Sequence, residues 1–298
     1  MAVRLGSRSV VMVRKSRFRN FAIGSPMLWI AIFVVVPYII VVLFSFLTRD
    51  PEGIVRWEFT LANYREIISP VFLRVCKNSF ILALGTTAIT LLTAYPFAYI
   101  LTRIDENIRR FLLLLMIIPF WTSSLIRTYA LIILLKANGI LNTLLLSLGL
   151  IDEPLSILYT ETAVFIGLVY TLLPFMILPL YASLQKLDRS FIEAARDLGA
   201  TSRHVFFHIV LPLTLPGIIA GSTMVFLPAL GLFYIPDLLG GARSMLIGNF
   251  IKNQFLTTGH WPLGSAACVI LTLLMFMLLL WYFISTRKAH SGGMETVR

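Results

Sequence analysis

The chain has 298 residues, of which 58% are hydrophobic and 13% charged, and its mean hydropathy is +0.88. This apolar share exceeds that of an ordinary soluble domain, so we expect an integral membrane protein. The net charge of +11 does not call for a nucleic-acid partner, because basic residues of membrane proteins gather on one side of the bilayer.

Six apolar stretches each reach about 20 residues, the length that a helix needs to cross about 30 Å of hydrocarbon. They cover Met27–Leu47, Phe80–Leu101, Phe111–Leu135, Thr162–Ser183, Ile209–Leu232 and Ser265–Ser285. Backbone N–H and C=O groups in lipid must pair within the protein, and these stretches are too long for barrel strands of about 10 residues. The predicted fold class is therefore all-α, with six transmembrane helices.

Basic residues indicate the orientation of the predicted spans. The segment before Met27 contains no acidic residue and carries Arg4, Arg8, Arg14, Lys15, Arg17 and Arg19. When the segments between the spans alternate across the bilayer, the side of this tail receives roughly twice the Lys and Arg of the other side. We therefore predict that both termini are cytoplasmic, with tails at 1–26 and 286–298 around a transmembrane domain at 27–285. The first span lacks a small-residue cleavage site and is kept as an anchor.

The sequence contains none of the common catalytic motifs. It has no phosphate-binding G-x-x-x-x-G-K-[ST], no H-E-x-x-H, no G-x-S-x-G and no cluster of carboxylates within a span. His204 and His208 have the i, i+4 spacing of two metal ligands but lack a third ligand nearby. Cys76 and Cys268 make no metal or disulfide pattern. We predict a chain without metal or resident cofactor that is not itself an enzyme.

The longest polar interruption on the predicted cytoplasmic side is the loop 184–208. Asp188 or Ser190 can cap a helix there, and Ser190 with Glu193 matches the capping box S-x-x-E. Gly199 can end this helix in a left-handed conformation, and Thr201 or Ser202 can begin a second one. The alanines after Glu193 leave a flat side on which another protein can sit closely. Alternatively, Glu193 only caps the helix and the alanines only favour it.

The same loop resembles a known family. Glu193, Ala194 and Ala195 are followed by three residues, Gly199, nine residues, and Ile209-x-Leu211-Pro212. This order is similar to the EAA signature of permease subunits of bacterial ABC importers with the type I fold. The resemblance implies that the loop is a coupling helix that docks on an ATPase. The positions carried over for coupling to the ATPase are Glu193, Ala194, Ala195, Asp197 and Gly199.

The family resemblance also implies the remaining parts of the transporter. The expected partners are a second permease subunit, two copies of an ATPase that bind ATP and Mg²⁺, an extracytoplasmic solute-binding protein and membrane lipid. The expected location is the inner membrane, with several passes. Further stretches resemble the polyamine branch, the permeases of spermidine/putrescine importers: "PFWTSSLIRTYALIILL", "GLVYTLLPFMILPLYASLQKLD", "LPLTLPGIIAG" and "LPALGLFYIPDLLGGARSMLIGN".

A polyamine path should offer carboxylates, aromatic faces and carbonyls to ammonium groups. Asp237 follows Phe233 and Tyr234 just beyond the fifth span, and a glycine pair after it permits a turn. In the third span, beyond a predicted kink at Pro119, a polar stripe joins Trp121 to Ser124 and Thr128. The path residues that we predict are Trp121, Arg127, Tyr129, Phe233, Tyr234 and Asp237.

Arg127 is the least expected of these residues, because a cation in a span is costly and repels a cationic cargo. It can reach toward water or pair with an acid such as Asp237 or one on a partner subunit. The aromatic residues can serve packing instead of cargo, and Asp237 can be solvated at the outer surface. The alternative functions are an ABC importer permease for another organic cation or an anion, and an integral membrane enzyme.

Overall fold

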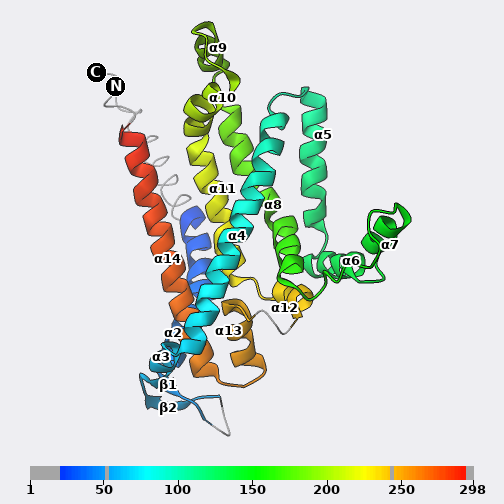
Figure 1. Cartoon of the computed structure of the whole chain (residues 1–298). Helices are drawn as coiled ribbons and strands as arrows, with labels where there is room; N and C mark the ends of the chain where they lie inside the picture. The colour runs from blue at the N-terminus through cyan, green and yellow to red at the C-terminus, as the bar shows by residue number, and fades with distance from the viewer. Residues whose placement is uncertain (1–20, 51–53, 242–244, 293–298) are drawn as a thin grey trace, which may run out of the picture.

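A computed structural model describes residues 21–50, 54–241 and 245–292, with side chains up to residue 280. Figure 1 shows a mostly helical molecule, in which the helix at 21–30 leads directly into η1. In chain order the elements are η1 (Ala31–Val35), α2 (Val36–Ser45), β1 (Leu47–Thr48), β2 (Arg56–Phe59), α3 (Ala62–Ile67), α4 (Pro70–Leu101), α5 (Glu106–Ile117), η2 (Ile118–Trp121), α6 (Ser124–Leu135), α7 (Ile140–Ser147), α8 (Glu161–Gln185), α9 (Arg189–Asp197), α10 (Ser202–Val205), η3 (Phe206–Val210), α11 (Leu211–Gly231), α12 (Tyr234–Gly240), α13 (Ile247–Leu256) and α14 (Trp261–Gly292).

The prediction of six membrane-crossing helices is confirmed in number within the described residues. The helical stretches that are long and apolar enough are Phe21–Ser45, Pro70–Leu101, Ser124–Ser147, Glu161–Gln185, Ser202–Gly231 and Trp261–Leu280. The first begins before the predicted boundary at Met27, and α14 continues beyond the predicted boundary at Ser285. Most of the basic N-terminal tail, at residues 1–20, and the end of the chain, at 293–298, lie outside the described residues.

The central layer of the molecule consists of α4, α8 and α11, which pack against one another (Figure 1). Their contacts bury a large apolar cluster that includes Leu168, Met176 and Val225. A buried polar contact also links the layer, because the hydroxyl of Tyr95 on α4 lies 2.9 Å from that of Thr214 on α11. In hydrocarbon such a pair satisfies two groups that lipid cannot.

Glycines let α11 approach α8 closely. A Cβ atom at Gly217 would lie 2.4 Å from Cβ of Ser183, and one at Gly221 would lie 2.7 Å from Sδ of Met176. Helices in membranes gain much of their association from such close packing of small residues, because lipid offers no hydrophobic force between them. The close contacts at these two glycines therefore hold together the two helices that carry the loop 184–208 between them.

The first and last helices form a side layer, in which α2 lies against α14 (Figure 1). At one end of this layer, α3 and α13 join α14 around a second buried cluster containing Ile67, Phe72 and Leu263. The all-α prediction misses a small feature at this end. β1 and β2 form an antiparallel hairpin between the first span and α3, and the amide of Asn63 donates to the carbonyls of Ser45 and Leu47 beside it.

The predicted third span, Phe111–Leu135, is not one continuous helix, and this part of the prediction is wrong. The helix α5 tightens into η2, the backbone is extended at Thr122, and α6 begins two residues later. Pro119 lies in the first turn of η2 and lacks an N–H, while the Thr122 hydroxyl donates to the Pro119 carbonyl at 2.8 Å. The predicted kink at Pro119 is thus a full break.

The break sends the two halves in different directions. In Figure 1, α5 runs along the bundle, whereas α6 leaves its end steeply and continues through a turn into α7. None of the residues of α5 is buried, while α6 packs against α8 and α12. The helix α5 therefore has an open face for lipid or a partner subunit, and α6 belongs to the end of the bundle that is opposite α9.

Candidate functional sites

The loop 184–208 contains a well-formed helix, α9, at the tip of the molecule (Figure 1). Its N-cap is Asp188, whose carboxylate accepts from the backbone N–H of Ser190 at 3.0 Å. This hydrogen bond lowers the pKa of Asp188 below its ordinary value of 3.8, because it stabilises the charged form. The alternative capping box is not formed, since Ser190 lies inside the helix and no hydrogen bond joins it to Glu193 among the described residues.

The helix ends as the sequence predicts. Gly199 has φ +83°, and its N–H donates to the carbonyl of Arg196 at 2.9 Å. The N–H of Ala200 donates to the carbonyl of Ala195 at 3.0 Å, which completes a Schellman motif. Thr201 then caps α10 by accepting from the N–H of His204, and the chain continues through η3 into α11. A short helix is thus held between two rigid spans.

One face of α9 packs on the body of the protein and the other is bare. Ile192 and Ala195 contact the central apolar cluster. Phe191, Ala194 and Leu198 share an adjacent, exposed face at helical spacing, and Leu198 is 89% exposed. Of the residues carried over from the EAA signature, Ala195 is partly buried and the others are exposed, namely Glu193, Ala194, Asp197 and Gly199. An exposed apolar face at a helical tip is typical of an interaction site.

The imidazoles of His204 and His208 stack with their ring centroids 3.9 Å apart, and Nδ1 of His208 lies 3.1 Å from the carbonyl oxygen of His204. Within the described part of the chain, no group of three His, Cys, Asp or Glu side chains is placed to bind a metal. The pair is therefore a local contact on the helix surface that leads into α11.

The predicted path residues come from two segments that pack together, η2–α6 and α12. Arg127 and Tyr129 lie on α6, Tyr234 and Asp237 on α12, and Phe233 at the N-cap of α12. Trp121 is separate, because the break after η2 removes it from the helix of Thr128 and leaves it 80% exposed. The predicted stripe from Trp121 through Thr128 is therefore wrong. The segments α6 and α12, which carry the other predicted path residues, do pack together.

The guanidinium of Arg127 lies 5.4 Å from the centroid of the Phe120 ring, a cation–π contact within its own segment. Its Nε atom is buried and has no hydrogen-bond partner among the described residues. The suggested ion pair between Arg127 and Asp237 is not formed, since Asp237 has other partners. Arg127 thus keeps an unused donor on α6.

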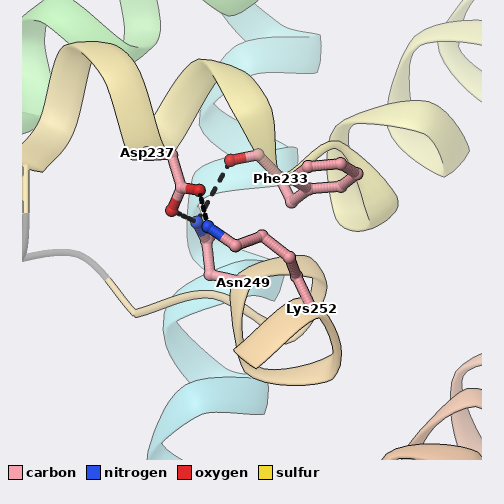
Figure 2. A network of polar contacts seen from close by, with 4 residues as sticks. All are labelled: Phe233, Asp237, Asn249 and Lys252. Atoms are coloured by element: carbon pink, nitrogen blue, oxygen red, sulfur yellow. Dashed lines mark hydrogen bonds and ion pairs between the residues drawn. The ribbon is translucent and has the colours of Figure 1, made fainter. Parts of the chain in front are cut away.

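Asp237 joins α12 to α13, as Figure 2 shows. One carboxylate oxygen accepts from the amide of Asn249 and the other from the ammonium of Lys252. The same Asn249 amide donates to the carbonyl of Phe233 at 3.1 Å. We call Asp237, Asn249 and Lys252 the Asp237 network. Lys252 and Asn249 were not predicted from the sequence. The signal that could have found them is a single cation, Lys252, in the otherwise uncharged α13.

Two cavities lie near α9. The first, of about 470 Å³, is bounded by the end of α4, the start of α5 and α9. The second, of about 500 Å³, lies between α8 and α11 and is lined by Ser183, Lys186, Phe191 and Gly217. Neither was anticipated from the sequence, because both are formed by segments far apart in the chain.

The fold is that of an integral membrane protein of helices with an exposed helical tip. The family described as "Binding-protein-dependent transport system inner membrane component" matches residues 88–290, and the chain belongs to this family. It is thus a non-catalytic transmembrane subunit of an ABC importer in the inner membrane, where the hydrolytic component is a partner ATPase and a periplasmic protein binds the solute.

Relatives that carry more specific names are similar over most of the chain. The spermidine/putrescine transport system permease protein PotB of Salmonella typhimurium (strain SL1344) is 49% identical over 276 residues, 93% of this chain and 96% of the relative. PotB of Escherichia coli K12 is 49% identical over 259 residues, 87% and 94% of the two chains. The permease YdcU of the same organism is 33% identical over 236 residues, 74% of each chain.

Solved structures agree on the fold. A bacterial ABC transporter that imports the acidic polysaccharide alginate has a chain with a TM-score of 0.71 at 18% identity, covering 93% of this chain and 99% of that one. The same transporter type in complex with a periplasmic protein bound to an alginate pentasaccharide matches with a TM-score of 0.72 at 16% identity. The type I ABC importer permease fold that the EAA signature implied is confirmed by these similarities.

Proposed function

We propose that this chain forms half of the translocation path of an ABC importer for polyamines such as spermidine and putrescine. The observation that carries the proposal is the 49% identity over 93% of the chain to a permease named for these two solutes. The second half of the path is a second permease subunit, and an extracytoplasmic polyamine-binding protein delivers the solute. ATP and Mg²⁺ bind to two copies of the ATPase and not to this chain.

In this proposal α9 is the contact with the ATPase. Its outer face offers Ala194, Phe191 and Leu198 to a groove, and its ends are held by the Asp188 cap and the turn at Gly199. Glu193 and Asp197 add charges beside that face. Because α9 is fixed between α8 and α11, closure of the ATPases moves both spans and opens the path toward the binding protein.

The orientation follows from the same contact. An ATPase works in the cytoplasm, so the loop 184–208, the basic tail 1–26 and the tail 286–298 all lie on the cytoplasmic side of the domain 27–285. The excess of Lys and Arg on this side supports the assignment. The hairpin of β1 and β2 and the helices α12 and α13 then face the binding protein.

The proposed path passes α6 and α12. Trp121, Tyr129, Phe233 and Tyr234 supply aromatic faces for ammonium groups. Asp237 is the carboxylate of this region. Because it already binds the ammonium of Lys252, its position suits a primary ammonium group. Entry of cargo then requires an ammonium of the polyamine to replace that of Lys252. The charge of Arg127 on α6 repels ammonium groups, so we expect the polyamine to lie nearer Asp237 on α12.

The test is ATP-dependent uptake of radiolabelled spermidine and putrescine into proteoliposomes that contain the whole complex. We compare the native chain with Glu193→Lys and Asp237→Asn. Glu193→Lys should abolish uptake while the subunits still assemble, because it reverses a charge at the ATPase contact. Asp237→Asn should lower uptake of polyamines without uncoupling ATP hydrolysis.

The outcomes separate cargo from mechanism. If ATP is hydrolysed on addition of the loaded binding protein but neither polyamine enters, the cargo assignment fails. An anionic solute is then the alternative, which the unpaired Nε of Arg127 favours. If Glu193→Lys transports normally, the coupling role of α9 fails instead. Conservative Glu193→Gln is the matched control for size.

A further inference from the structure

The cavity between α4, α5 and α9 is lined by an unusual set of charges. It has a volume of about 470 Å³, and its charged side chains are those of four arginines and one glutamate: Arg103, Arg109, Arg189, Arg196 and Glu193. Two of the arginines come from α9, one from α5 and one from the turn after α4, so the cavity exists only in the folded chain. The function proposed above uses Glu193 but none of these arginines.

The positive charges of the cavity are not neutralised within the described residues. Among the described residues, the ion pairs are Arg56–Glu58, Arg110–Glu106 and Lys252–Asp237. None of them includes an arginine of the cavity. Arg103 is held in place, because its guanidinium lies 4.4 Å from the ring centroid of Tyr99 and donates to the Tyr99 hydroxyl. Gathering guanidinium groups around one glutamate leaves repulsion that an anion would remove.

The cavity lies at the level where the membrane ends. Its lining begins at Tyr99 and Leu184, in the last turns of the spans α4 and α8. On α5, Ile108, Phe111 and Leu115 are each more than half exposed, and at helical spacing they share a face that is turned away from Arg109. The cavity therefore opens at the ends of the spans, and the apolar face of α5 lies on the other side of that helix.

We propose that this cavity, at the ends of the spans α4 and α8, binds the phosphate headgroup of an anionic phospholipid. Guanidinium groups bind phosphate oxygens in pairs and outperform ammonium groups in this role. Basic pockets between helices at the cytoplasmic surface are suited to such headgroups. Because Arg196 and Glu193 belong to α9, the bound lipid links the coupling helix to α4 and α5. The inference is independent of the cargo.

The experiment is native mass spectrometry of the whole complex, delipidated and then titrated with phosphatidylglycerol or phosphatidylcholine. The variant is Arg103→Gln with Arg109→Gln, and the matched control is Arg110→Gln. Arg110 is the neighbour of Arg109 but pairs with Glu106 and lies outside the cavity. We expect the affinity for phosphatidylglycerol to fall about tenfold or more in the double variant and less than about twofold in the control. Phosphatidylcholine should bind weakly to all three.

A second variant, Arg103→Lys with Arg109→Lys, retains the charge of the cavity. We expect it to lose less affinity for phosphatidylglycerol than the glutamine variant does. It also tests the proposal if the glutamine variant folds poorly. Equal binding of phosphatidylglycerol by the native and glutamine variants overturns the proposal. Inorganic phosphate that binds the native complex alone and displaces the lipid at millimolar concentration assigns the site to free phosphate. Loss of the ATPase from the double variant with unchanged lipid binding assigns the arginines to an acidic protein surface.

Discussion

The two ends of the molecule differ in whether their charged groups are paired within the chain. At the α9 end, Leu198 and Phe191 are exposed, and the four arginines that line the cavity form no ion pair among the described residues. At the other end, the Asp237 network pairs a half-buried carboxylate with two donors of the same chain. The α9 end therefore leaves apolar and charged groups for partners, whereas the Asp237 network is paired within the chain. Changes at the first end should alter assembly, and changes at the second should alter the stability of the chain.

The largest effect is expected for Leu198→Asp. Burial of a leucine side chain in a partner contributes about 1.5 to 3 kcal/mol, so its loss should weaken ATPase binding about ten- to a hundredfold. Leu256→Asp is the matched control, since Leu256 is also highly exposed but lies at the end of α13. Co-purification of the ATPase and uptake measure the effect. A similar loss in both variants would mean that the outer face of α9 is not special.

Breaking the Asp237 network should destabilise the chain itself. Asp237→Asn or Lys252→Met leaves a partner charge without its counterion, at a cost of about 1 to 3 kcal/mol for side chains that are about 30% exposed. The double variant should lose less than the sum of the two, because no unpaired charge remains. Thermal unfolding of the purified complex measures these changes. Additive losses would show that the two residues act separately.

Gly199→Ala should have a smaller effect, confined to α9. At φ +83° an alanine is strained by about 1 kcal/mol, although nothing lies within 4 Å of its Cβ. The last turn of α9 should fray, and ATPase affinity should fall severalfold. Gly259→Ala carries the same kind of strain at φ +62° on the opposite end. It should leave ATPase affinity unchanged, and a loss there would point to a global effect.

The smallest effect concerns the cap of α9. The pKa of Asp188 is lowered in the folded state, so the cap stabilises α9 above the unfolded pKa of about 3.8 and is lost as the pH falls through the folded pKa below that value. The protection of the α9 amides against hydrogen exchange, taken relative to the intrinsic exchange rate at each pH, should fall slightly on acidification in the native chain. Asp188→Asn should keep the cap at all pH values, and Asp188→Ala should show raised exchange at neutral pH as well. Identical exchange in all three chains would exclude the cap.

Much of the fold could be predicted because its signals are local. The lengths of the apolar segments identify the spans, apart from the third, and Gly199 predicts the end of α9 because only a few residues decide a turn. The capping box failed on the same local scale, since Asp188 competes with Ser190 for the N-cap. The third span failed because one proline and the packing of α6 on α12 together decide whether a helix bends or breaks.

Hydropathy, the distribution of basic residues and the spacing from Glu193 to Pro212 are enough to predict the class of the protein. Which charges meet depends instead on how the chain folds. Lys252 binds Asp237 across a separation of fifteen residues, and Arg103 and Arg196 line one cavity from segments of the chain that are far apart. The physical reason is that hydropathy and turns depend on neighbours in the chain, whereas ion pairs and cavities depend on neighbours in space.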